Sequence, residues 1–179
     1  MPCPRCHAEV AEDVEVCPHC RFTLSVLEMQ LPLPPPQTGH VNDWAGVLST
    51  AEAERITQRC QEVFTNTPAE LIVVTVPTTA PILPAEYVFW LANRWDMGGA
   101  DNHGLLILLA LHERRVESEV GYALEPLLSD AASAQLLEEH VVPCLRAGQY
   151  AEGLYQAVNV LGKVLEATHR PSRRRLWRR

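Results

Sequence analysis

Two Cys-Pro-x-Cys motifs stand at the start of the chain, and they constrain its first 25 residues more than any other feature. They pair Cys3 with Cys6 and Cys17 with Cys20, with ten residues between the pairs. Four thiolates in two close pairs are the ligand set of a tetrahedral structural zinc site. Because so short a segment has almost no apolar core, it needs such a cross-link to fold. The sequence therefore predicts a zinc ribbon over residues 1–25.

Two disulfides are the competing interpretation of these cysteines. Disulfides belong to oxidising compartments, and Met1 leads directly into the first motif without room for a signal peptide. A redox Cys-x-x-Cys site would need a βαβ pattern around it, which the sequence lacks. The segment resembles small zinc ribbons of bacterial N-termini, which are structural or dock a protein partner. In those ribbons glycine commonly follows each pair, where this chain has His7 and Arg21.

The charge of the chain is unevenly distributed. Its formal net charge is −7, yet residues 169–179 carry six arginines and no acidic residue. The acidic remainder makes nucleic acid an improbable partner, and the Arg-rich tail suggests a separate electrostatic contact. The longest apolar run, Leu105–Leu111, is far shorter than the roughly 20 residues of a membrane span. We therefore expect a cytoplasmic protein without a transmembrane segment.

Residues 26–39 are rich in proline and should form a semi-rigid linker that separates the ribbon from a core domain over residues 40–168. In the core, apolar spacing and a Ser-x-x-Glu capping box indicate helices, and β-branched or alternating runs indicate strands. The short turn between the last two strands predicts an antiparallel hairpin. The predicted helices are Ser49–Thr65, Pro84–Met97, Ser129–His140 and Tyr150–Ala167, and the predicted strands are Glu70–Pro77, Gly104–Leu111 and Arg114–Tyr122. This order implies an α/β fold with a small mixed sheet between helical layers.

Several strings in this core resemble the TPM domain family. They are residues 41–48 (VNDWAGVL), 101–106 (DNHGLL) and 119–125 (EVGYALE), followed by Leu128, Ser129 and Asp130. The resemblance covers roughly residues 40–165 and implies a three-layer α/β/α sandwich. It also implies a choice of functions, because members have been assigned acid phosphatase activity, calcium binding and auxiliary roles beside membrane proteins. The membrane helix and glycine-rich tail of many bacterial members are not found in this sequence.

Topology predicts one candidate site. The start of the second strand and the end of the third should lie at the same end of the sheet. Carboxylates there would be hard oxygen ligands for calcium or magnesium, although each also has a structural explanation as a helix or strand cap. The possible metal ligands are Asp101, Glu119, Glu125 and Asp130, and the further ligand-binding candidates are Asn102, Gly121 and Tyr122. Asp43 joins them because it matches the family motif, and His103 is the nearest histidine.

No motif for a catalytic nucleophile accompanies these carboxylates. The sequence lacks a Cys-x5-Arg loop, Asp-x-Asp, HExxH, GxSxG and a phosphate-binding glycine loop. The leading hypothesis is therefore a non-catalytic binding or adaptor protein, whose ribbon docks a partner and whose acidic pocket binds a divalent cation or small ligand. The alternatives are a metal-dependent acid phosphatase for small phosphate esters and a nucleic-acid-associated factor that uses the ribbon and the Arg-rich tail.

Overall fold

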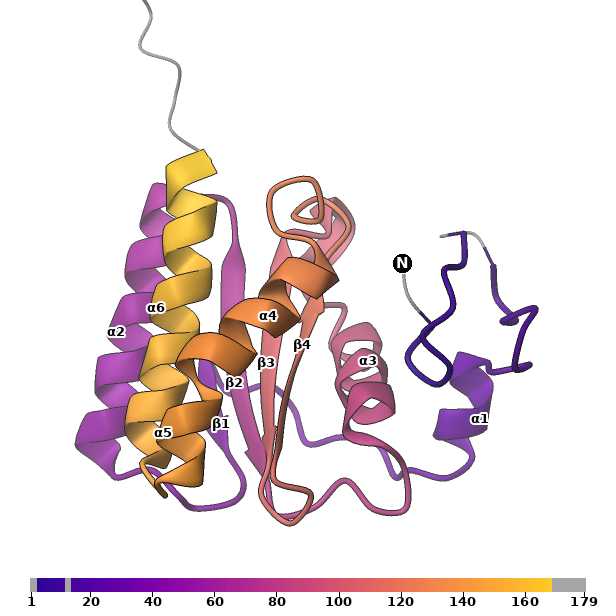
Figure 1. Cartoon of the computed structure of the whole chain (residues 1–179), viewed down its shortest axis with the longest axis horizontal. Coiled ribbons are helices and arrows are strands. Elements are labelled where there is room, and N and C mark those ends of the chain that lie inside the picture. Colours follow the sequence, from indigo (N-terminus) through magenta and orange to yellow (C-terminus); the bar gives the residue numbers. More distant parts are fainter. Residues whose placement is uncertain (1–2, 12–13, 169–179) are drawn as a thin grey trace, which may run out of the picture.

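The computed structural model describes residues 3–11 and 14–168, which form a four-stranded sheet with helices on both faces (Figure 1). The Arg-rich tail predicted for residues 169–179 lies outside the described residues. The elements in chain order are α1 (Leu24–Glu28), β1 (Val41–Asp43), α2 (Thr50–Asn66), β2 (Glu70–Val76), α3 (Pro84–Arg94), the 3-10 helix η1 (Gly99–Asp101), β3 (Gly104–Ala110), β4 (Arg115–Val120), α4 (Asp130–His140), α5 (Val142–Arg146) and α6 (Tyr150–Thr168).

The sheet has the strand order β1-β2-β3-β4 and is mixed. Strands β1, β2 and β3 run parallel, whereas β4 returns antiparallel to β3 as the predicted hairpin. The register places Glu70 of β2 beside Gly104 of β3. The backbone N–H of Gly121, just after β4, then donates to the carbonyl of Gly104 at 2.8 Å. The start of β3 and the end of β4 therefore share one end of the sheet, as the sequence predicts.

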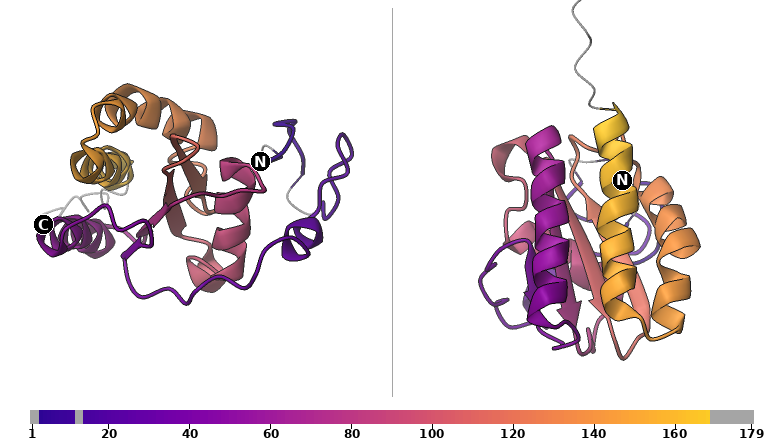
Figure 2. Two further views of the ribbon diagram at one scale, coloured as in Figure 1. Left: turned by 90° about the horizontal axis from the view of Figure 1, so that it is seen from below. Right: turned by 90° about the vertical axis from the view of Figure 1, so that its left-hand side faces the viewer.

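Both faces of the sheet are buried, which gives the three-layer α/β/α architecture. Leu71 and Val73 of β2 face the cluster under α2, α4 and α6, while Ile72 and Val74 face the cluster under α3. Figure 2 shows the two layers on opposite sides of the sheet. Because β2 and β3 are covered on both faces, their sequences are continuously apolar instead of alternating.

The helix signals in the sequence correspond closely to the helices of the structure. Ser49 accepts from the backbone N–H of Glu52 and Glu52 bonds back to Ser49, which completes the predicted capping box of α2. Pro84 lies in the first turn of α3, and Cys60 is fully buried in the core. Helix α3 ends at Arg94, three residues before the predicted end, and the chain then turns through two glycines of positive φ.

The predicted mechanical separation of ribbon and core is wrong, because the ribbon packs against α3. Phe22 is buried and lies edge-on to Phe89 of α3, with ring centroids 5.9 Å apart. Arg5 of the ribbon forms an ion pair with the buried Glu86 of α3. Helix α1 spans the predicted ribbon–linker boundary and buries Leu27 in the same cluster. Apolar residues that flank the proline run thus hold the ribbon on the core.

Candidate metal centre and acidic pocket

The four N-terminal cysteines converge on one point. The Sγ atoms of Cys3 and Cys20 are 3.7 Å apart, those of Cys6 and Cys17 are 3.8 Å apart, and all four lie within 4.8 Å of one another. A tetrahedron with zinc–sulfur bonds of about 2.3 Å has sulfur–sulfur edges of about 3.8 Å. A disulfide would bring two sulfurs to about 2.05 Å. The geometry therefore fits a tetrahedral four-thiolate metal site and not two disulfides.

Each cysteine pair lies on its own tight turn, and the two turns have the same backbone hydrogen bond. This turn determines the conformation of the residue that follows each pair. The N–H of His7 donates to the carbonyl of Cys3, and the N–H of Arg21 donates to the carbonyl of Cys17, each at 2.9 Å. His7 and Arg21 have φ values of 58° and 63°. These are left-handed conformations that favour glycine. Both turns form without the glycine that commonly follows such pairs.

The protonation of the thiols also fits a bound cation. The backbone N–H groups of Cys20 and His19 lower the pKa of Cys17 to about 6. Burial raises the pKa of Cys20 to about 12, and the neighbouring thiols add to the rise. The backbone thus favours the thiolate of Cys17, while Cys3 and Cys20, whose pKa values are raised, need a positive charge to ionise beside it. A divalent metal would supply that charge.

The end of the sheet that the sequence singled out does gather polar residues. The carbonyl of Asn102 accepts from the N–H of Ala123 at 3.3 Å, beside the Gly121–Gly104 hydrogen bond. A Cβ atom on Gly121 would lie only 2.3 Å from the Asn102 carbonyl oxygen. Glycine is therefore required at position 121 by the close approach of two backbones.

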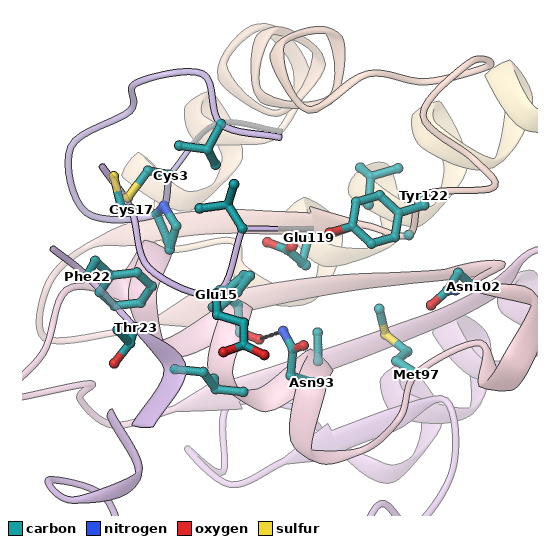
Figure 3. A pocket seen from close by; sticks show the side chains of 18 of the residues that line it. Cys3, Glu15, Cys17, Phe22, Thr23, Asn93, Met97, Asn102, Glu119 and Tyr122 are labelled. Atoms are coloured by element: carbon teal, nitrogen blue, oxygen red, sulfur yellow. Dashed lines mark hydrogen bonds between the residues drawn. The ribbon is translucent and has the colours of Figure 1, made fainter. Parts of the chain in front are cut away.

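A cavity of about 600 Å³ opens between this sheet end and the ribbon, and we call it the junction pocket (Figure 3). Five predicted candidates line it, namely Asn102, Glu119, Gly121, Tyr122 and Glu125. Its other walls come from the ribbon and from α3. The carboxylates in its lining are Glu15, Glu28, Asp96, Glu119 and Glu125. Among the residues that the structure describes, no arginine, lysine or histidine lines it.

Glu119 is the most perturbed carboxyl group of this region. Desolvation by surrounding protein atoms raises the pKa of Glu119 to about 8, and the charges of Asp130 and Glu125 add to the rise. Burial and the charge of Glu125 also raise the pKa of Asp130. One carboxylate oxygen of Asp130 is buried and has no hydrogen-bond partner among the described residues. The folded chain thus disfavours the ionised form of Glu119 near neutral pH, and a nearby cation would favour it.

The remaining predicted candidates lie elsewhere. Asp43 pairs with Thr75 near the opposite end of the sheet, where it accepts from the N–H of Leu48 at 2.9 Å and bonds to the Thr75 hydroxyl. It holds a loop and cannot share a site with Glu119. Asp101 is exposed, and neither Asp101 nor His103 lines the junction pocket. Asp130 lines a second cavity, of about 1110 Å³, between β4, α4 and the ribbon.

The acidic residues do not form a compact ion site in this structure. Within residues 3–11 and 14–168, the four cysteines are the only group that places three or more metal-ligating atoms within 4.8 Å of one another. The calcium or magnesium site expected at Asp101, Glu119, Glu125 and Asp130 therefore stays a prediction.

Three acidic residues of the junction pocket were missed by the sequence analysis, and all lie outside the predicted sheet end. Glu15 belongs to the ribbon, Glu28 to α1, and Asp96 follows α3. Glu28 already forms an ion pair with Arg94 at 2.6 Å. No local pattern marks these residues, because they meet Glu119 only when the ribbon docks on α3.

Comparison with known proteins agrees with this architecture. The profile of the TPM domain family matches residues 41–164. The N-terminal domain of a protein from P. gingivalis is 34% identical and aligns over 73% of this chain and 84% of its own, with a TM-score of 0.67. No curated protein matches the chain.

Two more distant solved structures share the fold. The N-terminal domain of a Corynebacterium glutamicum protein is 16% identical, over 75% of this chain and 86% of its own, with a TM-score of 0.59. The BA42 protein from Bizionia argentinensis is 18% identical, over 68% and 83%, also with a TM-score of 0.59. Among the described residues, every helix is too short or too polar to span a bilayer.

Proposed function

The chain belongs to the TPM domain family, and we propose that it acts as a non-catalytic binding protein for cationic ligands. In this proposal the four cysteines hold a structural zinc ion, and the zinc ribbon forms one wall of the binding site. The TPM domain forms the other wall. The junction pocket between them is the ligand site. The adaptor role predicted from the sequence, in which the ribbon also docks a protein partner, remains a prediction.

The observation that carries this proposal is the one-sided charge of the junction pocket. Within residues 3–11 and 14–168, five acidic side chains line it and no arginine, lysine or histidine does. A group that develops negative charge, such as a transferring phosphoryl group, is normally stabilised by metal ions, cationic side chains or aimed backbone amides. A positively charged ligand would instead favour the ionised form of Glu119, which burial and the charges of Asp130 and Glu125 disfavour.

Metal chemistry differs between the two parts of the molecule. The cysteine site fits zinc in ligand type, number and spacing. Calcium and magnesium are the second ligand class to test, because Glu119, Glu125 and Asp130 carry the oxygen ligands that these ions prefer. A rearrangement of these side chains would be needed to bring three oxygen ligands around one ion.

Titration of the zinc-loaded full chain with arginine amide, calcium and inorganic phosphate would test the proposal. We expect NMR shifts of the Glu119, Gly121 and Tyr122 amides with arginine amide or calcium and none with phosphate. The double variant Glu119→Gln/Glu125→Gln should weaken binding at least about tenfold, which corresponds to about 1.4 kcal/mol. A matched control is Glu54→Gln/Glu139→Gln, since both residues are exposed and outside the pocket lining. Preferential phosphate binding would overturn the proposal.

A further inference from the structure

We propose that the occupant of the junction pocket is an arginine side chain of the same chain, supplied by its Arg-rich C-terminal residues 170–179. The proposal rests on the cation-binding function above and names the ligand of that site. It follows from three independent observations: the size of the pocket, the chemistry of its walls, and the end of the molecule at which the chain leaves the fold.

The size of the pocket favours an organic cation over a bare metal ion. Its volume of about 600 Å³ lies within the range of about 300–1,000 Å³ that is typical of small-molecule sites. A calcium ion needs six to eight oxygens at about 2.3–2.6 Å. The described carboxylates place no three ligand atoms within 4.8 Å of one another. Without a rearrangement the described carboxylates thus offer no calcium site, whereas the volume suits a long side chain with a charged head.

The walls of the pocket combine negative charge with apolar and aromatic surface. Within the described part of the chain, Glu15, Asp96, Glu119 and Glu125 take part in no ion pair. Val14 and Val16 of the ribbon line the pocket and are 40% and 42% exposed. Figure 3 shows Glu15 on the ribbon side and Glu119 on the strand side of the same cavity.

Arginine matches this combination better than lysine or a small inorganic cation. Its planar guanidinium donates to carboxylates and also stacks on aromatic rings. The fold already uses such contacts, because the guanidinium of Arg5 lies 4.8 Å from the Phe22 ring centroid and that of Arg55 lies 3.6 Å from that of Tyr155. Phe22, Phe89 and Tyr122 present further aromatic surface in the pocket.

The tail begins at the correct end of the molecule. Helix α6 ends at Thr168, and Asn66 at the end of α2 donates to Glu166 at 3.1 Å. The next strand starts at Glu70, whose N–H donates to the carbonyl of His103. His103 immediately precedes β3, beside the pocket residue Gly121. Figure 1 shows the end of α6 and the loop after β4 at the same end of the sheet.

The length and composition of the tail also fit. Residues 169–179 can extend over about 36 Å at most, at about 3.3 Å per residue. They carry six arginines together with Leu176 and Trp177, and thus combine positive charge with apolar side chains as the pocket walls require. The acidic remainder of the chain attracts such a segment, and the pocket offers the apolar contacts that a flat acidic surface lacks.

The test compares the zinc-loaded full chain with a full-length variant in which all six tail arginines are replaced by glutamine. We expect the substitutions to shift the amide signals of Glu15, Glu119 and Tyr122. A synthetic peptide of residues 169–179 should then bind the variant and restore the original signals. In the tail-substituted chain, Glu15→Gln/Glu119→Gln should weaken peptide binding at least about tenfold. The control pair Glu54→Gln/Glu139→Gln should leave it within about twofold, because exposed charges contribute little.

Each contrary result overturns the tail as occupant, the cation-binding function, or both. Pocket signals that are identical in the two chains would overturn the tail as occupant. If arginine amide still binds in the junction pocket, the proposed cation-binding function stands, although the tail is not its ligand. If neither arginine amide nor calcium binds, both proposals fail. Equal weakening of peptide binding by the control pair would indicate non-specific attraction. Signal shifts that vanish on dilution, together with loss of a dimer, would show that the tail binds the pocket of a second copy. Either result overturns the inference.

Discussion

At the scale of single residues, Glu119 carries the strongest electrostatic signature outside the cysteines. It lies near the end of β4, faces the side of the sheet that α3 and the ribbon cover, and lines the junction pocket. Desolvation raises the pKa of Glu119 to about 8, with Asp130 and Glu125 contributing. Because Glu119 stays protonated near neutral pH in the folded chain, the free energy of unfolding should depend on pH, and the sign of this dependence can be predicted.

We predict that the free energy of unfolding falls as pH rises from 5 to 8.5, and that Glu119→Gln removes much of this fall. Between the unfolded pKa of about 4.3 and the folded pKa, the native state binds more protons than the unfolded state. Stability from this group is therefore full below pH 4.3 and is lost as pH rises through about 8. Urea unfolding of the zinc-saturated protein at several pH values would measure it, with a difference between the chains of at least about 1 kcal/mol.

The control for this experiment is Glu54→Gln, which replaces an exposed carboxyl group outside the pocket lining. It should follow the wild-type pH profile, since an exposed acid has little to gain from protonation on folding. A wild-type profile that is flat between pH 5 and 8.5, or one that Glu119→Gln leaves unchanged, would contradict the prediction.

The sequence predicts some of these residues well because their chemistry is local. Cys3 and Cys6 meet on one turn, so their spacing alone indicates a metal site. Asp43 is different, since its motif string says nothing about which end of the sheet it reaches. Asp43 belongs to a three-residue strand too short to leave a pattern. Its placement away from Glu119 required the sheet register.

At the scale of elements, the contact between the ribbon and α3 determines the shape of the junction pocket. Phe22 is 5% exposed and packs on Phe89, and Arg5 reaches Glu86, whose side chain is also 5% exposed. A buried carboxylate that loses its partner is costly. We therefore expect the ribbon to stabilise α3 through these contacts, beyond its covalent connection by the proline-rich segment.

We predict that Phe22→Ala lowers the free energy of unfolding by about 2–4 kcal/mol, because it removes a buried aromatic side chain at the docking contact. The matched control is Phe64→Ala on α2, where the side chain is 54% exposed and the cost should be below about 1 kcal/mol. Thermal unfolding followed by circular dichroism would compare the two. Equal losses would show that Phe22 contributes no more than a surface residue.

Metal content gives a second prediction at this scale. The purified chain should hold one zinc ion, since four thiolates can fold this ribbon only around a metal. Chelation should also lower the melting temperature of the core, because the ribbon supports α3. Less than about 0.2 zinc per chain after gentle purification would contradict the site. A melting temperature unaffected by chelation would contradict the support of α3 by the ribbon.

The elements themselves were largely predictable, and the exceptions share a cause. The helices α2, α3, α4 and α6 and the strands β2, β3 and β4 carry full periodic patterns or cap signals. Strand β1 and helix α1 span only three and five residues, fewer than a pattern needs to repeat. Both are stabilised by partners distant in sequence: β1 by β2, and α1 by α3.

At the scale of the whole molecule, the ribbon and the TPM domain combine into a single acidic pocket that neither part contains alone. Their sequence signals are separate, and a proline-rich segment lies between them. Nothing in these signals predicts that Glu15 of the ribbon and Glu119 of the sheet line one cavity. Docking of the two parts depends on apolar surface complementarity, which residue spacing does not encode.

The charge of this pocket leads to the last prediction, which separates a binding protein from a metal-dependent phosphatase. Because its described lining has five acidic side chains and no cationic one, the pocket should repel phosphate esters unless metal ions neutralise it. We expect at most trace hydrolysis of an aryl phosphate by the zinc-loaded chain, with calcium, magnesium or manganese added in turn. Turnover should stay far below the roughly 1–1,000 per second of ordinary enzymes.

The decisive variants in that assay are Glu119→Gln and Asp130→Asn, with Glu54→Gln as the control for folding and preparation. Robust turnover that Glu119→Gln and Asp130→Asn both abolish and the control retains would overturn the binding-protein proposal and assign catalysis to the acidic end of the sheet. Turnover that survives both variants would instead indicate a contaminating phosphatase, because a reaction at this site would depend on these carboxylates to hold the metal. Comparing the three variants at equal zinc content therefore tests the function without reference to the identity of the natural ligand.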